Sequence, residues 1–135
     1  MDAPMQVIAQ KCLEGAQSNS MTFPQVVSTL MQAGFEGYSV DFRKGVVAYY
    51  SPAGEAVEFS GAKPDLPVAV NFNVATVKEA IREAQALTPG YTYGGFINKV
   101  AGAGCAGYMV SFLGRRVLYF SRSGETHVEY FPDSN

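Results

Sequence analysis

The feature that most constrains this chain is an internal repeat with an offset of 70 residues. Residues 22–55 read TFPQVVSTLMQAGFEGYSVDFRKGVVAYYSPAGE and residues 92–125 read TYGGFINKVAGAGCAGYMVSFLGRRVLYFSRSGE, and the two segments align without a gap. Twelve positions are identical, whereas composition alone would give about two or three identities over such a span. The chain therefore contains one supersecondary unit twice, and its fold has to accommodate both copies.

The repeat explains a glycine pattern that would otherwise suggest a nucleotide-binding loop. The stretch GAGCAGY, Gly102 to Tyr108, contains G-x-G-x-x-G, but the first copy reads QAGFEGY and has Gln32 in place of the first glycine. In both copies the glycines follow a helical pattern and precede a strand pattern, which reverses the order of a dinucleotide fingerprint. We predict that Gly34 and Gly104 end helices with a positive φ, and we expect no cofactor.

Each copy begins with a helix. Thr22 and Gln25 form a capping box around Pro24, and the apolar residues that follow recur at helical spacing. The second copy keeps Thr92 but has glycines in place of the rest of the box, so its helix start should be weaker. A further amphipathic helix precedes each unit, and Asn73 is the predicted N-cap of the second of these.

A β-hairpin follows each helix of the repeat. Apolar and polar residues alternate in its strands, as expected when one face of a strand is buried. A two-residue turn at residues 44–45 places Phe42 opposite Val47. In the second copy a turn at residues 114–115 places Phe112 opposite Val117. With this register the repeated apolar residues all fall on one face of the sheet.

A third strand follows a glycine-containing turn in each copy, over residues 55–59 and 125–131. The segments VEF and VEY near the ends of these strands match at an offset of 71 rather than 70. The extra residue is His127, so we expect the second strand to be either longer or bulged.

The pattern of elements predicts an α+β protein with helices packed on antiparallel sheet. The tandem ααβββ repeats span approximately residues 3–59 and 73–131, and a linker at 60–72 joins them. Each half is too small to be stable alone, so we expect a single domain over residues 1–135 in which the halves share one core about a pseudo-two-fold axis.

The composition argues against several classes of partner. With 12 acidic and 10 basic residues the chain has no basic excess, so we expect no nucleic-acid partner. No apolar run approaches the ~18 residues that span a bilayer and no secretory signal is visible, so we expect no membrane association and a cytoplasmic location. Cys12 and Cys105 should then be buried, reduced thiols. A chain with one histidine cannot build a metal site from several imidazoles, so we expect no metal.

The candidates for acid–base chemistry are few. Glu125, His127 and Glu129 alternate on the last predicted strand, so their side chains share one face and could meet, with Asp41 as a further candidate nearby. A histidine flanked by carboxylates can serve as a general acid or base. A solvent-facing strand surface with mixed charge is the alternative interpretation and the one we favour.

Four tyrosines of the repeat are candidate ligand-binding residues. Tyr38, Tyr49, Tyr108 and Tyr119 face the same way as the core residues. Their hydroxyls could line a cavity, or they could lie at the edge of the core with the hydroxyls in water.

Several segments resemble one known family. TFPQVVSTLMQAGFEGYSVDF, VAYYSPAGE, LPVAVNFN, AGCAGYMVSFLGRRVLYF and HVEYFP are similar to a family of uncharacterised bacterial and prophage-borne proteins. That family is catalogued as domain of unknown function 1398 and is sometimes labelled phage envelope protein. The resemblance covers nearly the whole chain but implies no activity, cofactor or catalytic residue. The envelope label has no physical support in this sequence.

Three functions remain open. We favour a non-enzymatic binding or interaction module of bacterial or prophage origin, with an unidentified small-molecule ligand or a second copy of the chain, paired through a sheet edge, as its partner. The first alternative is a small acid–base enzyme or ligand sensor that uses His127 with Glu125 or Glu129. The second is a phage accessory or structural protein, and the only support for this alternative is the label given to the family.

Overall fold

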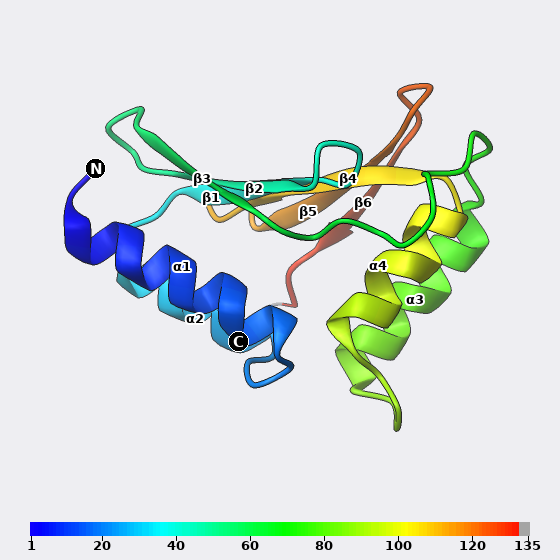
Figure 1. Ribbon diagram of the computed structural model, residues 1–135, viewed down its shortest axis with the longest axis horizontal. Helices are drawn as coiled ribbons and strands as arrows, with labels where there is room; N and C mark the ends of the chain where they lie inside the picture. The colour runs from blue at the N-terminus through cyan, green and yellow to red at the C-terminus, as the bar shows by residue number, and fades with distance from the viewer. Residues whose placement is uncertain (133–135) are drawn as a thin grey trace.

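The computed structural model describes residues 1–132 and consists of two layers (Figure 1). Four helices lie beneath a six-stranded antiparallel sheet, which confirms the predicted α+β architecture. The elements in chain order are α1 (Ala3–Gln17), α2 (Phe23–Gln32), β1 (Gly37–Asp41), β2 (Val46–Tyr50), β3 (Ala56–Ser60), α3 (Val74–Ala86), α4 (Tyr93–Gly102), β4 (Cys105–Ser111), β5 (Arg116–Ser121) and β6 (Thr126–Tyr130).

The predicted helix ends are confirmed. At the start of α2 the Thr22 hydroxyl oxygen accepts the backbone N–H of Gln25, while the Gln25 side chain accepts the backbone N–H of Thr22. At the start of α4, Thr92 accepts the backbone N–H of Gly95. Gly34 and Gly104 follow these two helices with φ of 95° and 90°, a conformation that favours glycine.

The strands are ordered β3-β2-β1-β4-β5-β6, so β1 and β4 pair at the centre of the sheet. Gly37 and Gly107 lie at this central pair. A Cβ atom on Gly37 would collide with the carbonyl oxygen of Val110, and one on Gly107 would collide with that of Val40. Gly107, the last glycine of the apparent fingerprint, and its counterpart Gly37 therefore allow the two central strands to approach each other.

The predicted hairpin register is wrong by two residues. Val47 pairs with Val40 rather than with Phe42, and Val117 shows the same change in the second hairpin. The first turn therefore spans residues 42–45 instead of two residues. Because a shift of two residues preserves the alternation of side chains, the apolar residues still fall on one face, as predicted.

Asp41 accounts for the wider turn. Its Oδ1 accepts the backbone N–H groups of Arg43 and Lys44, at 2.9 and 3.0 Å. Phe42 consequently leaves the strand, and its side chain becomes almost fully buried in the core. A two-residue turn would have provided neither the hydrogen bonds nor this burial.

The expected longer or bulged third strand is also wrong. β6 begins and ends 70 positions after β3, and its pairing with β5 is regular. The preceding turns have the same length, because Ser51 and Ser121 each donate a backbone N–H to the carbonyl four residues later. The match of VEF and VEY at an offset of 71 is therefore not a structural equivalence. By register, His127 takes the position of Val57.

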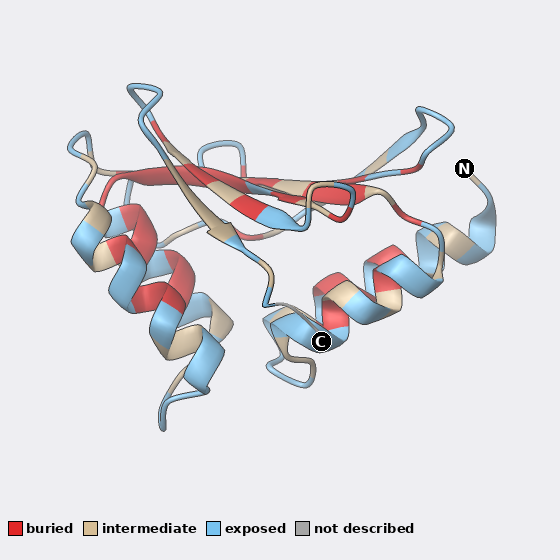
Figure 2. Cartoon of the chain, turned by 180° about the vertical axis from the view of Figure 1, so that it is seen from behind, coloured by how far each residue is buried: buried red, intermediate tan, exposed pale blue. Residues whose placement is uncertain are grey.

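The core lies between the sheet and the helices. Figure 2 shows buried residues along the central strands of the sheet and on the sides of the helices that face the sheet. Cys12 and Cys105 are buried free thiols, as predicted. Among residues 1–132 no helix combines the length and the apolar composition that crossing a membrane requires.

Candidate ligand-binding cavity

A cavity of about 1160 Å³ lies beneath the sheet, between the two helical hairpins. α1 packs along α2 and α3 along α4, whereas the hairpins touch each other mainly through a small contact of α1 with α4. Figure 1 shows the two hairpins on either side of this space, with their loop ends nearer to each other than their ends at the sheet. Side chains from all four helices and from every strand except β3 line the space between them. The volume is sufficient for a drug-sized molecule.

Four tyrosines form the ceiling of the cavity. In sheet order they are Tyr49 on β2, Tyr38 on β1, Tyr108 on β4 and Tyr119 on β5, and all four are buried. Successive ring centres lie 5.5, 6.3 and 5.6 Å apart, so the rings form a continuous row. The structure thus brings the four predicted ligand-binding candidates together at one surface, away from the solvent-exposed rim.

A fifth tyrosine joins this row from the helical layer. The hydroxyl of Tyr93, on α4, lies 2.7 Å from that of Tyr108. Burial raises the pKa of Tyr93 to about 12 and raises those of Tyr38 and Tyr108 well above their usual value. Burial also raises the pKa of Tyr49 and Tyr119. The ceiling therefore presents uncharged hydroxyl groups at neutral pH.

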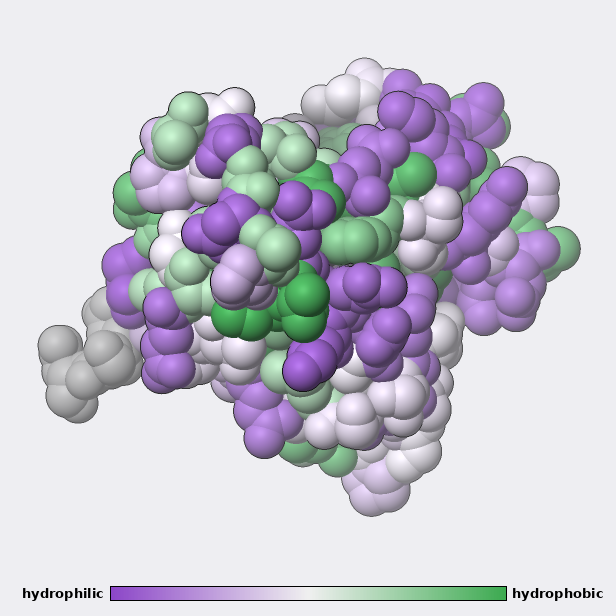
Figure 3. Space-filling model, turned by 60° about the vertical axis from the view of Figure 1, so that its left-hand side comes forward, coloured by the Kyte–Doolittle hydropathy of each residue, from purple (hydrophilic) through white to green (hydrophobic). Residues whose placement is uncertain are grey.

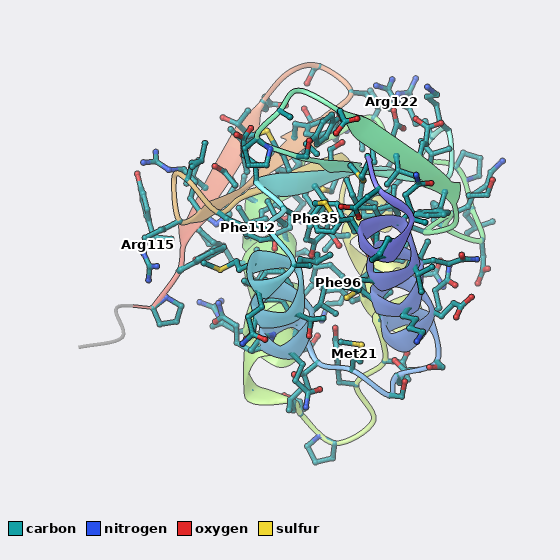
Figure 4. The ribbon with its side chains drawn as sticks, turned by 90° about the vertical axis from the view of Figure 1, so that its left-hand side faces the viewer. Met21, Phe35, Phe96, Phe112, Arg115 and Arg122 are labelled. Carbon is teal, nitrogen blue, oxygen red and sulfur yellow. The ribbon has the colours of Figure 1, made fainter. Side chains whose placement is uncertain are left out.

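The helices add apolar side chains to the cavity wall. Phe23, Val27 and Met31 follow one another at a spacing of four residues along α2, and all three line the cavity. Phe23 and Met31 remain 41% and 44% exposed, which is unusual for residues that belong to the apolar side of an amphipathic helix. Figure 4 shows Phe96 and Met21 among the helices beneath the sheet.

The cavity is edged on one side by the end of the described chain. The backbone N–H of Phe131 donates to the carbonyl of Arg115, and the Phe131 ring packs edge-on against Phe23 at 6.4 Å. Arg115 lies in the β4–β5 turn, and its guanidinium carbon is 6.0 Å from the centre of the Phe131 ring. In Figure 4 its side chain lies at the edge of the molecule. The β6 edge of the sheet therefore forms a rim facing α2.

His127 and Glu129 form a hydrogen-bonded pair at this rim. The Nε2 atom of His127 lies 2.8 Å from Oε1 of Glu129, and the imidazole stacks on the ring of Tyr119 at 6.4 Å. Glu129 lines the cavity, whereas His127 is not among the lining residues. The side chain of His127 is 15% exposed, so this pair is not a solvent-facing strand surface.

The other two acid–base candidates lie apart from this pair. Glu125 is exposed in the turn before β6, where its carboxylate accepts the hydroxyl of Ser123. Asp41 has its carboxylate engaged by the backbone of the β1–β2 turn. Neither residue lines the cavity. Within residues 1–132, no three histidine, cysteine, aspartate or glutamate side chains come together as a metal site would require.

Sequence reasoning did not indicate the helical residues of the cavity. The apolar residues of α2 follow a spacing that is typical of residues packed against a core, so nothing in their pattern marks them as open to a cavity. One sequence difference does single out Tyr93. The aligned residue in the first copy is Phe23, so only the second copy has a hydroxyl at this position. In Figure 3 hydrophobic side chains come to the surface among hydrophilic ones on the face shown.

A comparison with protein-family models finds one match, over residues 10–129, to a family described as protein of unknown function (DUF1398). The chain belongs to this family. The matched residues include the second half of α1, the remaining helices, and the sheet up to Glu129 in β6, so the DUF1398 match covers nearly the whole lining of the cavity. No curated protein matches the chain.

Proposed function

We propose that this DUF1398 protein binds a small, largely apolar molecule in the cavity between its helical hairpins. The observation that carries the proposal is the cavity itself, with a volume of about 1160 Å³ and a ceiling of four buried tyrosine rings. Concave sites lined by apolar and aromatic side chains, with a few polar groups among them, are typical of ligand pockets.

The tyrosine hydroxyls support a ligand with a neutral hydrogen-bonding group. Tyr93 and Tyr108 share one hydrogen bond between two hydroxyls, so one O–H donor of the pair remains for another acceptor. Because burial raises the pKa of both phenols, these groups do not ionise near neutral pH. A carbonyl or hydroxyl oxygen of the ligand is the natural acceptor.

We infer that residues 3–59 and 73–131 are tandem halves related by a pseudo-two-fold axis, and that the cavity lies where they meet. The bounds of α4 lie 70 positions after those of α2, and those of β6 lie 70 positions after those of β3. The central pairing of β1 with β4 joins the two halves in one sheet. Each half then supplies one helical hairpin and half of the ceiling.

An acid–base enzyme is the second candidate, and the His127–Glu129 hydrogen bond favours it. In this arrangement the histidine holds and polarises a carboxylate that reaches the cavity. Binding remains the better proposal, because only one member of the pair lines the cavity and a catalytic base needs to reach the proton that it removes.

The test is a fluorescence titration with the neutral dye N-phenyl-1-naphthylamine. The chain has no tryptophan, so the dye can be excited through the tyrosines of the ceiling without competing indole absorption. The Ala84→Phe variant places a ring in the cavity from α3, and we expect its Kd for the dye to rise at least about tenfold.

The matched control is Ala53→Phe, which adds the same ring to an exposed turn between β2 and β3. It should bind the dye as the wild-type protein does. The proposal fails if the wild-type protein gives no saturable signal, or if the two variants bind the dye equally well.

A further inference from the structure

The cavity is not equivalent on its two sides. β6 contributes Glu129 and Tyr130 to the lining, whereas β3, its counterpart at the other edge of the sheet, contributes no residue. At the β3 edge the inward-facing residues Val57 and Phe59 pack against the core. The space therefore extends toward β6, where the lining includes the carboxylate of Glu129.

The two edges differ in charge at equivalent positions. Val47 pairs with Phe59 on β3, and Val117, which lies 70 positions after Val47, pairs with Glu129 on β6. Glu129 thus stands where the first half has a phenylalanine. The side chain of Glu129 is 33% exposed, so the carboxylate lies partly in the protein, where an apolar residue would fill the same place without a desolvation cost.

We propose that the ligand is an amphiphile with a cationic head group, and that Glu129 binds this group at the β6 rim. This inference rests on the proposed function. Among the described residues His127 is the hydrogen-bond partner of the Glu129 carboxylate, and it occupies Oε1. Oε2 is then free to accept from, or pair with, a group in the cavity.

Arg115 is the other charged residue of the lining, and it does not neutralise Glu129. It is exposed in the β4–β5 turn and lies over the outer rim residue Phe131, with no ion pair to a carboxylate among residues 1–132. The ring of Tyr119 lies between His127 and the rest of the ceiling and belongs to the row of tyrosines. A cation at Glu129 therefore meets the carboxylate at the β6 end of the row of tyrosines.

The apolar part of the ligand would lie against the apolar lining that continues from Glu129. From Glu129 the lining continues along the tyrosine ceiling on one side and along Phe23, Val27 and Met31 of α2 on the other. A flexible chain or a flat ring system fits between these two surfaces. A head group with a negative charge would face Glu129 unfavourably.

The test compares three ligands with the same ten-carbon chain, decyltrimethylammonium, decanol and decyl sulfate. Each displaces N-phenyl-1-naphthylamine, the two ionic compounds below their micelle concentrations and decanol below its solubility limit. We expect the ammonium compound to displace the dye at a concentration about tenfold lower than decanol, and decyl sulfate to be the weakest of the three. Glu129→Gln should reduce the advantage of the ammonium compound over decanol to less than about twofold.

Glu125→Gln is the matched control, because it removes a carboxylate that precedes the same strand but does not line the cavity. It should keep the wild-type order of the ligands. If decanol and decyltrimethylammonium displace the dye equally from the wild-type protein, the inference is wrong, whether or not the variants fold. A preference that survives Glu129→Gln in a folded variant overturns the role of Glu129. Failure of the dye itself to bind instead removes the proposed function.

Discussion

The hydroxyl of Tyr93 on α4 lies 2.7 Å from the hydroxyl of Tyr108 on β4. This hydrogen bond connects the helical layer to the sheet beside the cavity, and it joins a buried residue, Tyr108, to a partly buried one, Tyr93. Residue 23, which lies 70 positions before Tyr93 in the sequence alignment of the two segments, is a phenylalanine and cannot form such a bond.

Replacing either partner should destabilise the protein by about 1 kcal/mol, because Tyr93→Phe or Tyr108→Phe leaves the other hydroxyl without its partner. The double variant should lose less than the sum of the two single losses, since the second substitution removes the orphaned group. Urea unfolding of the four proteins measures this coupling. Tyr130→Phe, at a residue 64% exposed on β6, is the control and should leave stability unchanged. Fully additive losses would show that the hydroxyls do not interact.

Stability should fall at high pH. Burial raises the pKa of Tyr93 to about 12 in the folded protein, whereas an unfolded tyrosine titrates near 10. The folded state therefore binds this proton more tightly, and the resulting stabilisation is complete below about pH 10 and is lost as the pH rises through about 12. Tyr38 and Tyr108 act in the same direction.

The free energy of unfolding, measured in urea at about pH 8 and about pH 11, checks this dependence. The decline between these two values should be smaller in Tyr93→Phe, which lacks one of the titrating groups. A stability that is the same at both pH values would mean that the tyrosines of the ceiling ionise as freely in the folded protein as in the unfolded one.

Two glycines of the apparent nucleotide-binding motif should respond oppositely to alanine. At Gly107 a Cβ would collide with the carbonyl oxygen of Val40 and with the ring of Phe120, so Gly107→Ala should cost roughly 1–3 kcal/mol. At Gly102, the last residue of α4, a Cβ meets open space, and alanine is the better helix former by about 1 kcal/mol. Gly102→Ala should therefore be neutral or stabilising. Thermal unfolding measures both, and a large loss at Gly102 would reopen a role for that residue beyond the helix.

Much of the fold could be predicted because it depends on local patterns. The capping box at Thr22, the positive φ of Gly34 and the N-cap at Asn73 all depend on residues within a few positions of one another. The hairpin register was missed because the Asp41 carboxylate competes with the strand pairing for backbone N–H groups. Alternation alone cannot detect a shift of two residues, since both registers bury the same face.

The candidate site could be predicted only in part. The common orientation of the four ceiling tyrosines follows from the alternation of side chains along the strands. The same alternation places His127 and Glu129 on one face of β6, where they can form a hydrogen bond. The cavity could not be predicted, because it results from how far apart the two helical hairpins lie, and no residue pattern within one hairpin encodes that distance. For the same reason the exposed side of α2 looked like an ordinary core-facing stripe.

The joining of both hairpins in a single polypeptide has a consequence for how such a pocket can evolve. Two identical subunits that met at β1 and β4 would have to carry the same residues on both walls. In one chain, Phe59 and Glu129 are encoded separately at matching places, so the β3 edge can stay apolar and packed while the β6 edge gains a charge that reaches the cavity. Selectivity can then change on one side without disturbing the packing on the other.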